Sequence, residues 1–225
     1  MVPCYNAARY LDEALASVWA QQVPNVDVVV VDDGSTDGSA AVAAEHGPAV
    51  TVLGQPNLGI SAARNRGIFA ARGELIAFLD ADDVWTPGSL AARLAALEAD
   101  PAAECAAGLV EQFVSPDVSP DVAKRLVYVA APSRGRVAGT MLLRRSVFER
   151  VGLFDGSFDV GETIDWVSRA DAAGVRTAPL CAVVLRRRIH GANMVRRAER
   201  LHADYLRVLR ASIDRRRQRS EDAVA

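Results

Sequence analysis

Apolar residues follow two alternating patterns along the first hundred positions of the chain. Short continuous apolar runs predict buried strands, and apolar residues spaced three and four apart predict helices that bury one face. The predicted strands cover residues 2–5, 26–32, 50–53 and 74–80, and the predicted helices cover 35–46, 62–71 and stretches that begin at Asn6 and at Thr86-Pro87. Strand–helix alternation of this kind predicts an α/β fold, with a doubly wound, mostly parallel sheet and helices on both of its faces.

Residues at the helix ends refine these boundaries. Ser61 is predicted to cap the helix 62–71, and Pro87 to occupy the first position of its helix, because both residue types are common at those places. Further along the chain, Ser146 is predicted to cap a short helix over 147–151. Gly174 is predicted to end a helix over 162–173.

The second half of the chain has weaker periodicity. Prolines and glycines punctuate residues 112–138, which predicts an extended excursion around a strand near Leu126–Val129. Further strands are predicted at 141–145, 175–180 and 182–189. From about residue 197 we expect an arginine-rich helix, with an apolar stripe made of Leu201, Tyr205, Val208 and Leu209.

Composition and charge narrow the class of protein. Half of the 225 residues are hydrophobic and the formal net charge is −2, which is a globular composition and argues against a general nucleic-acid binder. No apolar run approaches the length of a membrane span, and Arg9 precedes any hydrophobic signal region. The three cysteines form no CxxC pair, so we expect neither a disulfide framework nor a zinc site, and we expect a cytoplasmic protein.

Acidic residues follow two of the predicted strands at the point where each strand ends. Because side chains alternate along a strand, Asp80 and Asp82 are predicted to leave the same face of the strand 74–80. Two adjacent carboxylates repel each other unless a cation lies between them, and their oxygens suit Mg²⁺ or Mn²⁺, which in turn suit a diphosphate. The alternative is a solvated acidic loop.

Asp32 and Asp33 follow the strand 26–32 in the same way. Ligands of open α/β sheets bind beyond the carboxyl ends of the strands, so two strands that both end in acids predict a binding site. The alternative for Asp32 and Asp33 is an ordinary turn with an Asp or Ser helix cap.

Three linked motifs resemble the successive signatures of family 2 glycosyltransferases. They are Val31-Asp-Asp-Gly-Ser-Thr-Asp37, Asn57-Leu-Gly-Ile-Ser-Ala-Ala-Arg-Asn65 and Phe78-Leu-Asp-Ala-Asp-Asp-Val-Trp-Thr-Pro87. The resemblance covers residues 2–100 closely and continues more loosely to about residue 193. It implies a GT-A fold, an inverting sugar transfer and a nucleotide-activated sugar as donor, with an acceptor that is a saccharide, a lipid-linked molecule or a small molecule.

The same resemblance assigns roles to residues of the first half. Asp82 is implied to bind the divalent cation, Mg²⁺ or Mn²⁺, and Asp80 to hold the ribose or share the metal. Asp32 and Asp33 are implied to recognise the base. The resemblance places a base pocket at Pro3 and Tyr5, and it places Arg64 near the nucleotide; for Arg64, a salt bridge to one of the site acids is compatible with that role.

A catalytic base is implied at the start of the helix 162–173. An inverting transferase needs a group that takes the proton of the acceptor hydroxyl, and Glu162 and Asp165, three positions apart, are predicted to share a face of this helix. The chain departs from the family pattern, because Thr163 stands where the family has the second acid of a Glu-Asp pair. The base is then Glu162 or Asp165, or the role is lost; the alternative is that both acids only complement the helix dipole.

The run Arg186-Arg-Arg-Ile-His190-Gly-Ala-Asn193 lies where the family often has an Arg-x-His close to the diphosphate. On a strand Arg186, Arg188 and His190 share a face, so His190 is a candidate metal ligand and an arginine a candidate phosphate contact. The tail arginines 215–217 and 219 are expected at a solvated helix end, where they are also able to meet an anionic membrane surface.

These observations predict one GT-A-like domain over 1–195, with a nucleotide-binding half at 1–105 and an acceptor and catalytic half at 106–195, followed by a basic helical tail at 196–225. Only Met1 and Val2 precede Pro3, so either the chain starts late or the central sheet lacks most of an inner strand. The competing functions are a degenerate binder of nucleotide sugars or of a partner, and a nucleotidyltransferase, although the chain has no glycine-rich phosphate loop near its N-terminus.

Overall fold

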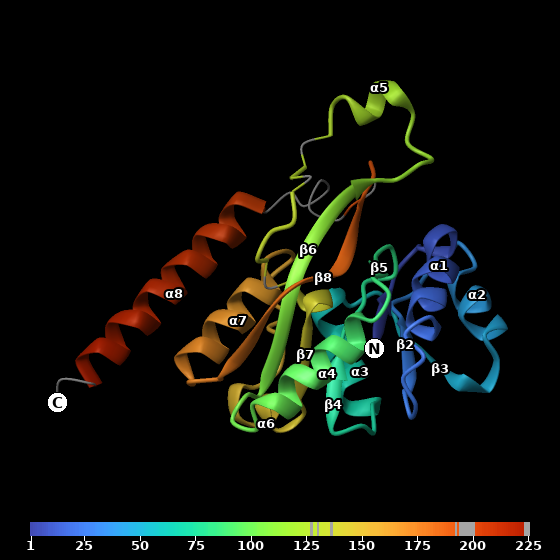
Figure 1. Ribbon diagram of the computed structural model, residues 1–225. Coiled ribbons are helices and arrows are strands. Elements are labelled where there is room, and N and C mark those ends of the chain that lie inside the picture. Colours follow the sequence, from blue (N-terminus) through green and yellow to red (C-terminus); the bar gives the residue numbers. More distant parts are fainter. Residues whose placement is uncertain (127, 130, 136, 192, 194–200, 223–225) are drawn as a thin grey trace.

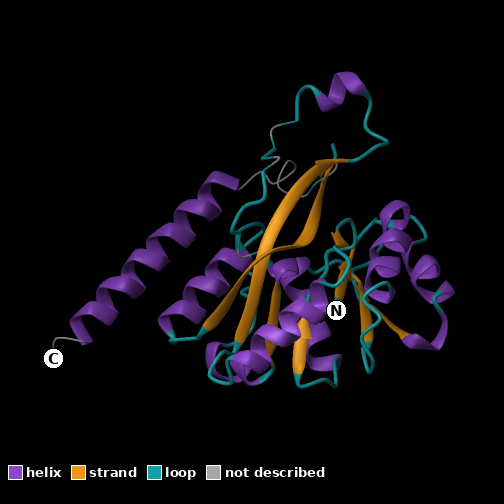
Figure 2. Cartoon of the chain, in the orientation of Figure 1, coloured by secondary structure: helices purple, strands orange, loops and turns teal. Residues whose placement is uncertain are grey.

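The computed structural model describes residues 1–126, 128–129, 131–135, 137–191, 193 and 201–222 of the chain. Its strands form two neighbouring sheets, and helices pack against them (Figure 1, Figure 2). This arrangement confirms the predicted α/β class.

The first sheet is parallel, in the order β1 (Val2–Cys4), β2 (Val28–Asp32) and β3 (Val50–Gly54). Alternate valines of β2 lie in different parts of the core. Val28 and Val30 belong to the cluster that includes α1 (Ala8–Trp19), whereas Val29 and Val31 pack with Ala63 of α3 (Ile60–Ala70). Because both faces of β2 are covered, the strand is a continuous apolar run in the sequence.

The second sheet is mixed. Its order is β4 (Leu75–Ala77), β7 (Met141–Arg144), β6 (Cys105–Val114), β8 (Thr177–Ile189) and β5 (Val84–Trp85). The β6–β8 pair is parallel, and the β4–β7, β6–β7 and β5–β8 pairs are antiparallel. The mostly parallel order expected of the sheet therefore holds for β1, β2 and β3 and for the β6–β8 pair, whereas the other pairs of the second sheet are antiparallel.

The two sheets meet beside β1. The backbone nitrogen of Met1 donates to the carbonyl of Ala77 at 2.9 Å, and the nitrogen of Leu79 donates to the carbonyl of Met1 at 3.1 Å. These bonds place the segment after β4 next to β1, so the acids that follow β2 and β4 belong to neighbouring chain segments.

The remaining helices lie around both sheets, and the first of them packs against α1, β2 and β3. They are α2 (Ser39–Glu45), α4 (Ser89–Ala99), α5 (Pro120–Ala123), α6 (Ser146–Val151), α7 (Glu162–Ala172) and α8 (Leu201–Asp222), and short 3-10 helices cover Gly47–Ala49 and Ala138–Thr140. A second core cluster contains the aromatic residues Phe78, Phe148, Phe154 and Trp166, whose rings lie 5.1 to 6.4 Å apart. This cluster fixes α6 and α7 against β4.

Several sequence predictions are wrong in detail. Ser61 lies inside α3 and donates to the carbonyl of Asp155, because the helix already begins after Gly59. Pro87 precedes α4, whose N-cap is Gly88, and Ser146 is the first residue of α6 rather than its cap. The region predicted as a strand at Leu126–Val129 has no strand among its described residues, whereas β6 is a long strand that the sequence did not indicate.

The helix α8 lies beside α7 along one edge of the molecule (Figure 1). Of its predicted apolar stripe, Val208 is buried and Leu209 is exposed. The side chains of Leu201, Arg216, Arg217 and Arg219 fall outside those the structure describes, as does the predicted boundary between 195 and 196. Within the described part of the chain, every helix is too short or too polar to cross a bilayer.

Candidate functional site

Arg64 of α3 joins two of the predicted site acids. Its guanidinium donates from Nη2 to Asp80 Oδ1 at 2.8 Å and from Nη1 to Glu162 Oε1 at 2.5 Å. The same Nη1 donates to the hydroxyl oxygen of Thr163 at 3.0 Å. Three segments that are far apart in the sequence therefore converge on one cation.

The surroundings of Arg64 are dry and acidic. The side chain is 3% exposed, and its guanidinium carbon lies 5.5 Å from the centre of the Phe154 ring. Burial by itself lowers the pKa of this guanidinium, but the carboxylates of Asp80 and Glu162 outweigh burial and raise that pKa above its ordinary value. Among the buried side-chain atoms of the described residues, Arg64 Nε is the nitrogen or oxygen that lacks a hydrogen-bond partner. Arg64 is thus a permanently charged guanidinium that pairs with the carboxylates of Asp80 and Glu162.

Asp80 and Asp82 lie in a turn rather than on a strand. The strand β4 ends at Ala77, and the nitrogen of Asp83 donates to the carbonyl of Asp80 at 3.0 Å. The predicted strand alternation is therefore not what orients these acids, because the turn sends Asp80 toward Arg64 and Asp82 toward His190. Their side chains are 35% and 27% exposed, so both carboxylates remain accessible to a ligand.

His190, a candidate metal ligand from the sequence, lies against Asp82. Its Nε2 lies 3.0 Å from Asp82 Oδ2, and Asn193 Nδ2 donates to the same oxygen at 3.3 Å. Tyr10 of α1 packs on the imidazole with ring centres 4.9 Å apart. No sequence pattern indicated Tyr10, because an aromatic residue with a hydroxyl group is common on an amphipathic helix.

Arg188 stabilises the turn that contains Asp82 and Asp83. Its backbone nitrogen donates to Asp83 Oδ1 at 2.9 Å, and its Nε donates to the carbonyl of Asp82 at 2.8 Å. Its Nη2 donates to Glu13 at 2.5 Å, and the rings of Tyr10 and Phe113 lie 4.9 and 4.8 Å from the guanidinium carbon. A buried guanidinium with these contacts is a turn-holding group, which argues against the phosphate contact that the sequence suggested for an arginine of this run.

Arg186 and Asp83, which also lie near this turn, are in different environments. Arg186 pairs with Glu111 at 3.4 Å on the surface, and its side chain is 46% exposed. Asp83 is buried; burial first, and then the charges of Asp82 and Asp80, raise the pKa of its carboxyl well above the usual value.

Replacing Arg188 with Met should lower the free energy of unfolding by roughly 2 kcal/mol or more, because the change removes a charge-assisted hydrogen bond and two cation–π contacts. The variant Arg186→Met removes an exposed ion pair and one cation–π contact, with Phe113 at 4.5 Å, and should cost about 1 kcal/mol or less because both are solvent-exposed. Urea unfolding of both variants measures the difference. Equal losses would contradict the turn-holding role of Arg188.

Asp32 and Asp33 take different places. Asp33 anchors the loop between β3 and α3, because its carboxylate accepts hydrogen bonds from Gln55 Nε2 at 2.7 Å and from the nitrogens of Leu58 and Gly59 at 2.9 Å. Asp32 accepts one from the nitrogen of Ser35 at 3.1 Å. Of the two predicted base-recognition acids, Asp32 is therefore the better candidate, and Asp33 shapes the loop that leads to Arg64.

The predicted base pocket lies beside Asp32. Pro3 is buried in β1, whereas Tyr5 is 51% exposed. Asn6, at a φ of 49°, accepts a hydrogen bond from the nitrogen of Thr36 at 2.8 Å and so ties this turn to the loop after β2. An exposed ring next to a fixed turn is able to take a planar base.

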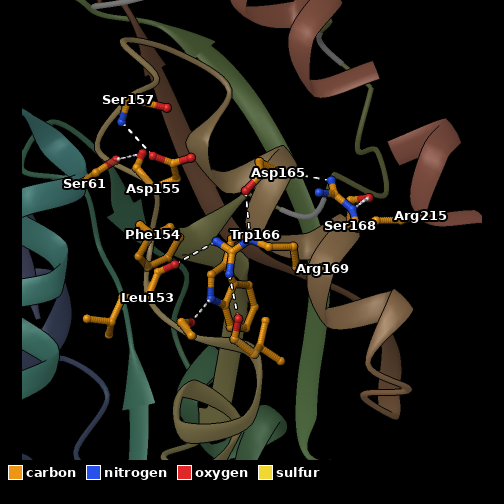
Figure 3. A network of polar contacts seen from close by, with 12 residues as sticks. Ser61, Leu153, Phe154, Asp155, Ser157, Asp165, Trp166, Ser168, Arg169 and Arg215 are labelled. Carbon is orange, nitrogen blue, oxygen red and sulfur yellow. Dashed lines mark hydrogen bonds and ion pairs between the residues drawn. The ribbon is translucent and has the colours of Figure 1, made fainter. Parts of the chain in front are cut away.

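Glu162 and Asp165 begin the same helix but contact different neighbours. Glu162 faces Arg64 and is 5% exposed; Thr163 donates to the same oxygen, Oε1, at 2.8 Å. Asp165 instead accepts from Arg169 Nε at 2.9 Å and from Arg215 Nη2 of α8 at 3.0 Å (Figure 3). Both acids are buried in the first turn of α7, but they are engaged by different partners, and two arginines on Asp165 argue against a role as base.

The loop between α6 and α7 is fastened from several sides (Figure 3). Arg169 donates to the carbonyls of Val151 at 2.8 Å and Leu153 at 2.7 Å, and the indole nitrogen of Trp166 donates to the carbonyl of Gly152 at 2.8 Å. Asn65, next to Arg64, donates from Nδ2 to the carbonyl of Phe154 at 2.8 Å and accepts at Oδ1 from the nitrogen of Phe154 at 3.0 Å. The position of Glu162 therefore depends on α3 as well as on its own helix.

Asp82, His190 and Asp80 provide only part of the coordination shell of a divalent cation, so other ligands would have to complete it. Within the part of the chain that is described, no group of three His, Cys, Asp or Glu side chains is arranged to hold a metal. Asp82 and His190 form an adjacent pair, with Asp80 on the same turn. Divalent cations such as Mg²⁺ are commonly held by one or two carboxylates together with substrate phosphates and water, so these residues fit such an ion.

A cavity of about 250 Å³ lies elsewhere, between α7 and α8. Ile164, Val167, Ser168, Asp171, Ala172, Ser212 and Arg215 line it. Neither Asp80 nor Asp82 lines this cavity. The candidate site formed by the charged residues around Arg64 is therefore separate from it.

Comparisons with known proteins identify the family and the fold. The sequence model of Glycosyl transferase family 2 matches residues 1–152. An uncharacterized glycosyltransferase of Rickettsia typhi is 30% identical over 168 residues, which is 70% of this chain and 53% of that protein. One of Nostoc sp. is 49% identical over 90 residues, or 38% of this chain and 28% of that protein. The chain thus spans about half the length, or less, of these relatives.

Two solved structures share the fold. S. aureus TarS 1–349 in complex with UDP-GlcNAc superimposes with a TM-score of 0.75 at 21% identity, covering 95% of this chain and 64% of that one. The mannosyltransferase PcManGT from Pyrobaculum calidifontis, in complex with GDP-Man and Mn²⁺, gives a TM-score of 0.67 at 27% identity and covers 93% and 63%. With a family match over two thirds of its length, this chain belongs to glycosyl transferase family 2.

Proposed function

We propose that this domain binds a nucleoside-diphosphate sugar and transfers the sugar to an acceptor hydroxyl with inversion. One observation carries the proposal: Arg64 draws Asp80 and Glu162 together beside the partly exposed Asp82, which is paired with the buried His190. A cation-binding edge and a candidate base therefore lie around a single buried guanidinium. Residues 1–105 would hold the nucleotide, with Asp32, Pro3 and Tyr5 toward the base, and 106–195 would complete the acceptor side.

Asp82 and His190, with Asp80 nearby, are the residues that would hold Mg²⁺ or Mn²⁺, whose chemistry is to neutralise negative charge on a diphosphate. PcManGT was solved with Mn²⁺ and GDP-Man, which supports testing Mn²⁺ first. Arg64 contributes a fixed positive charge behind Asp80 and is not itself exposed to the donor.

Glu162 is the base of this proposal. Its Oε1 is occupied by Arg64 and Thr163, and among the described residues no hydrogen bond holds Oε2. Oε2 takes the proton of the acceptor hydroxyl while the hydroxyl oxygen attacks the anomeric carbon. The bond between that carbon and the diphosphate oxygen breaks with its electron pair, and the nucleoside diphosphate leaves.

A domain that binds the donor without turnover is the second candidate. Thr163 occupies the place of an acid, and Glu162 is already paired with Arg64, so both observations favour reduced or absent catalysis. Family membership and the absence of a glycine-rich phosphate loop from the sequence disfavour the nucleotidyltransferase. A membrane contact through the basic α8 remains a separate proposal, motivated by its exposed Leu206, Leu209 and Ile213.

Thermal unfolding with UDP-GlcNAc and GDP-Man, each with and without Mn²⁺, tests donor binding. A ligand at about 100 times its Kd stabilises a protein by about 2.7 kcal/mol, so the melting temperature should rise with donor concentration. Asp82→Ala should abolish the Mn²⁺-dependent part of the rise, whereas Asp121→Ala, a change at an 89% exposed carboxylate, should not. Unchanged Mn²⁺ dependence in Asp82→Ala would exclude the metal role, and no stabilisation of the wild type by any nucleotide sugar would exclude the function.

A further inference from the structure

Side chains of the helix α8 bind the loop 157–160, which leads into α7. Its Asp204 has a side chain that is only 2% exposed. Asp204 Oδ2 accepts hydrogen bonds from the backbone nitrogens of Asp159 at 3.0 Å and Val160 at 3.3 Å. A buried carboxylate that receives two successive N–H groups fixes the path of that backbone.

Arg207, one turn along α8, holds the same loop from its other end. It donates from Nη1 to the carbonyl of Ser157 at 3.1 Å and from Nη2 to the hydroxyl of Ser157 at 3.0 Å, and its guanidinium lies 4.4 Å from the centre of the Phe158 ring. Its Nη1 also lies 3.3 Å from Asp204 Oδ1, which compensates the buried charge. The two side chains together hold every residue from 157 to 160.

The gripped segment ends at the candidate base. Gly161, with a φ of 86°, is the N-cap of α7, and Glu162 is the first residue of that helix. A Cβ added at Gly161 would lie 3.4 Å from Val208 Cγ2, so α8 also packs directly on this turn. A shift of residues 159–161 therefore moves Glu162 relative to Arg64. Further along α7, Arg215 holds Asp165 and Ser168 at 3.0 and 3.3 Å.

We propose that Asp204 is a positioning residue for sugar transfer, and that α8 belongs to the catalytic architecture rather than to a separable tail. The inference rests on the proposed function and deepens it. Of the arginines expected at a solvated helix end, Arg215 instead contacts α7, and Asp204 and Arg207 contact the loop before it. The helix lies outside residues 1–152, where the family model matches, so the grip adds to the motifs of the family.

Three variants of the full chain separate positioning from general stability. Asp204→Ala removes both acceptor oxygens. Asp204→Asn keeps one carbonyl oxygen for the two N–H groups. Asp214→Ala alters an exposed carboxylate on the same helix and is the matched control. Each is assayed well below its melting temperature for donor affinity, for kcat, and for amide hydrogen exchange over residues 157–163.

Asp204→Ala should lower kcat by about 10- to 100-fold with donor Kd unchanged, since a misplacement of about 1 Å can cost that much. Its loop amides should exchange fast, whereas Asp204→Asn should recover most of both properties and Asp214→Ala should match the wild type. A kcat of Asp204→Ala equal to that of Asp214→Ala, or unchanged exchange in Asp204→Ala, would overturn the inference. A wild type that binds donor but never turns over fails the proposed function instead, and a loss of loop protection confined to Asp204→Ala would then still support the grip on Glu162.

Discussion

Turnover should fall by about 10²–10⁴-fold when Glu162 is replaced with Gln, while donor affinity stays within about twofold. Gln retains an oxygen for the hydrogen bond from Arg64 Nη1, so the variant keeps the local geometry and loses the proton-accepting group. Initial rates with a donor found by thermal unfolding, and donor Kd by calorimetry, measure the two quantities separately.

Asp165→Asn is the matched control for this experiment, because it removes the other acid at the start of α7. Both oxygens of Asp165 are paired with arginines, so its loss should affect stability more than turnover. If Glu162→Gln retains near wild-type turnover, Glu162 is not the base. A wild type that binds donor but transfers no sugar to any acceptor would establish the degenerate binder.

Replacing Arg64 with Met should destabilise the fold by about 3–5 kcal/mol, because the change leaves a buried carboxylate without its partner. Glu162 is 5% exposed and Arg64 is 2% exposed, so water cannot replace the lost contact cheaply. Chemical unfolding of the variant and of the wild type measures this loss of stability.

The double variant Arg64→Met, Glu162→Gln sharpens that test. It removes both charges of the buried pair, so it should be more stable than Arg64→Met alone, with an interaction energy of about 0.5–3 kcal/mol in the double-mutant cycle. Strictly additive losses would show that the pair is not coupled. Arg72→Met, at an arginine whose side chain is 83% exposed, should change stability by less than about 1 kcal/mol.

Local patterns were sufficient to predict the parallel half of the fold. The run Val28–Val31 is apolar on both faces because helices cover both faces, so its periodicity already indicates burial. The position of the acids after β2 and β4 followed from the same strands. The long strand β6 was not indicated, because Gly108 and partly exposed polar positions such as Glu111 interrupt its pattern.

The partners of the site residues were beyond the reach of local patterns. Sequence spacing placed Glu162 and Asp165 on one face, but tertiary contacts with Arg64 and with Arg215 decide which way each acid is engaged. Asp32 and Asp33 are adjacent residues of the same type, so the sequence does not distinguish them. Only the fold shows that the carboxylate of Asp33 accepts hydrogen bonds from the backbone nitrogens of Leu58 and Gly59. Asp204 carries no motif, since its role comes from a loop more than forty positions away.

The long reach of the Arg64 pair has a consequence for biosynthesis. Arg64 and Glu162 are 98 positions apart, and Asp82 and His190 are 108 apart. At a translation rate of about 5–20 residues per second, the ribosome needs about 5 to 20 s after making Arg64 before it adds Glu162. During that interval the nascent chain carries the strands of the parallel sheet and a cation whose buried carboxylate has not been made. The Arg64 pair therefore cannot close until about a hundred residues after Arg64 have been added, and until then the parallel sheet carries a guanidinium without its Glu162 partner.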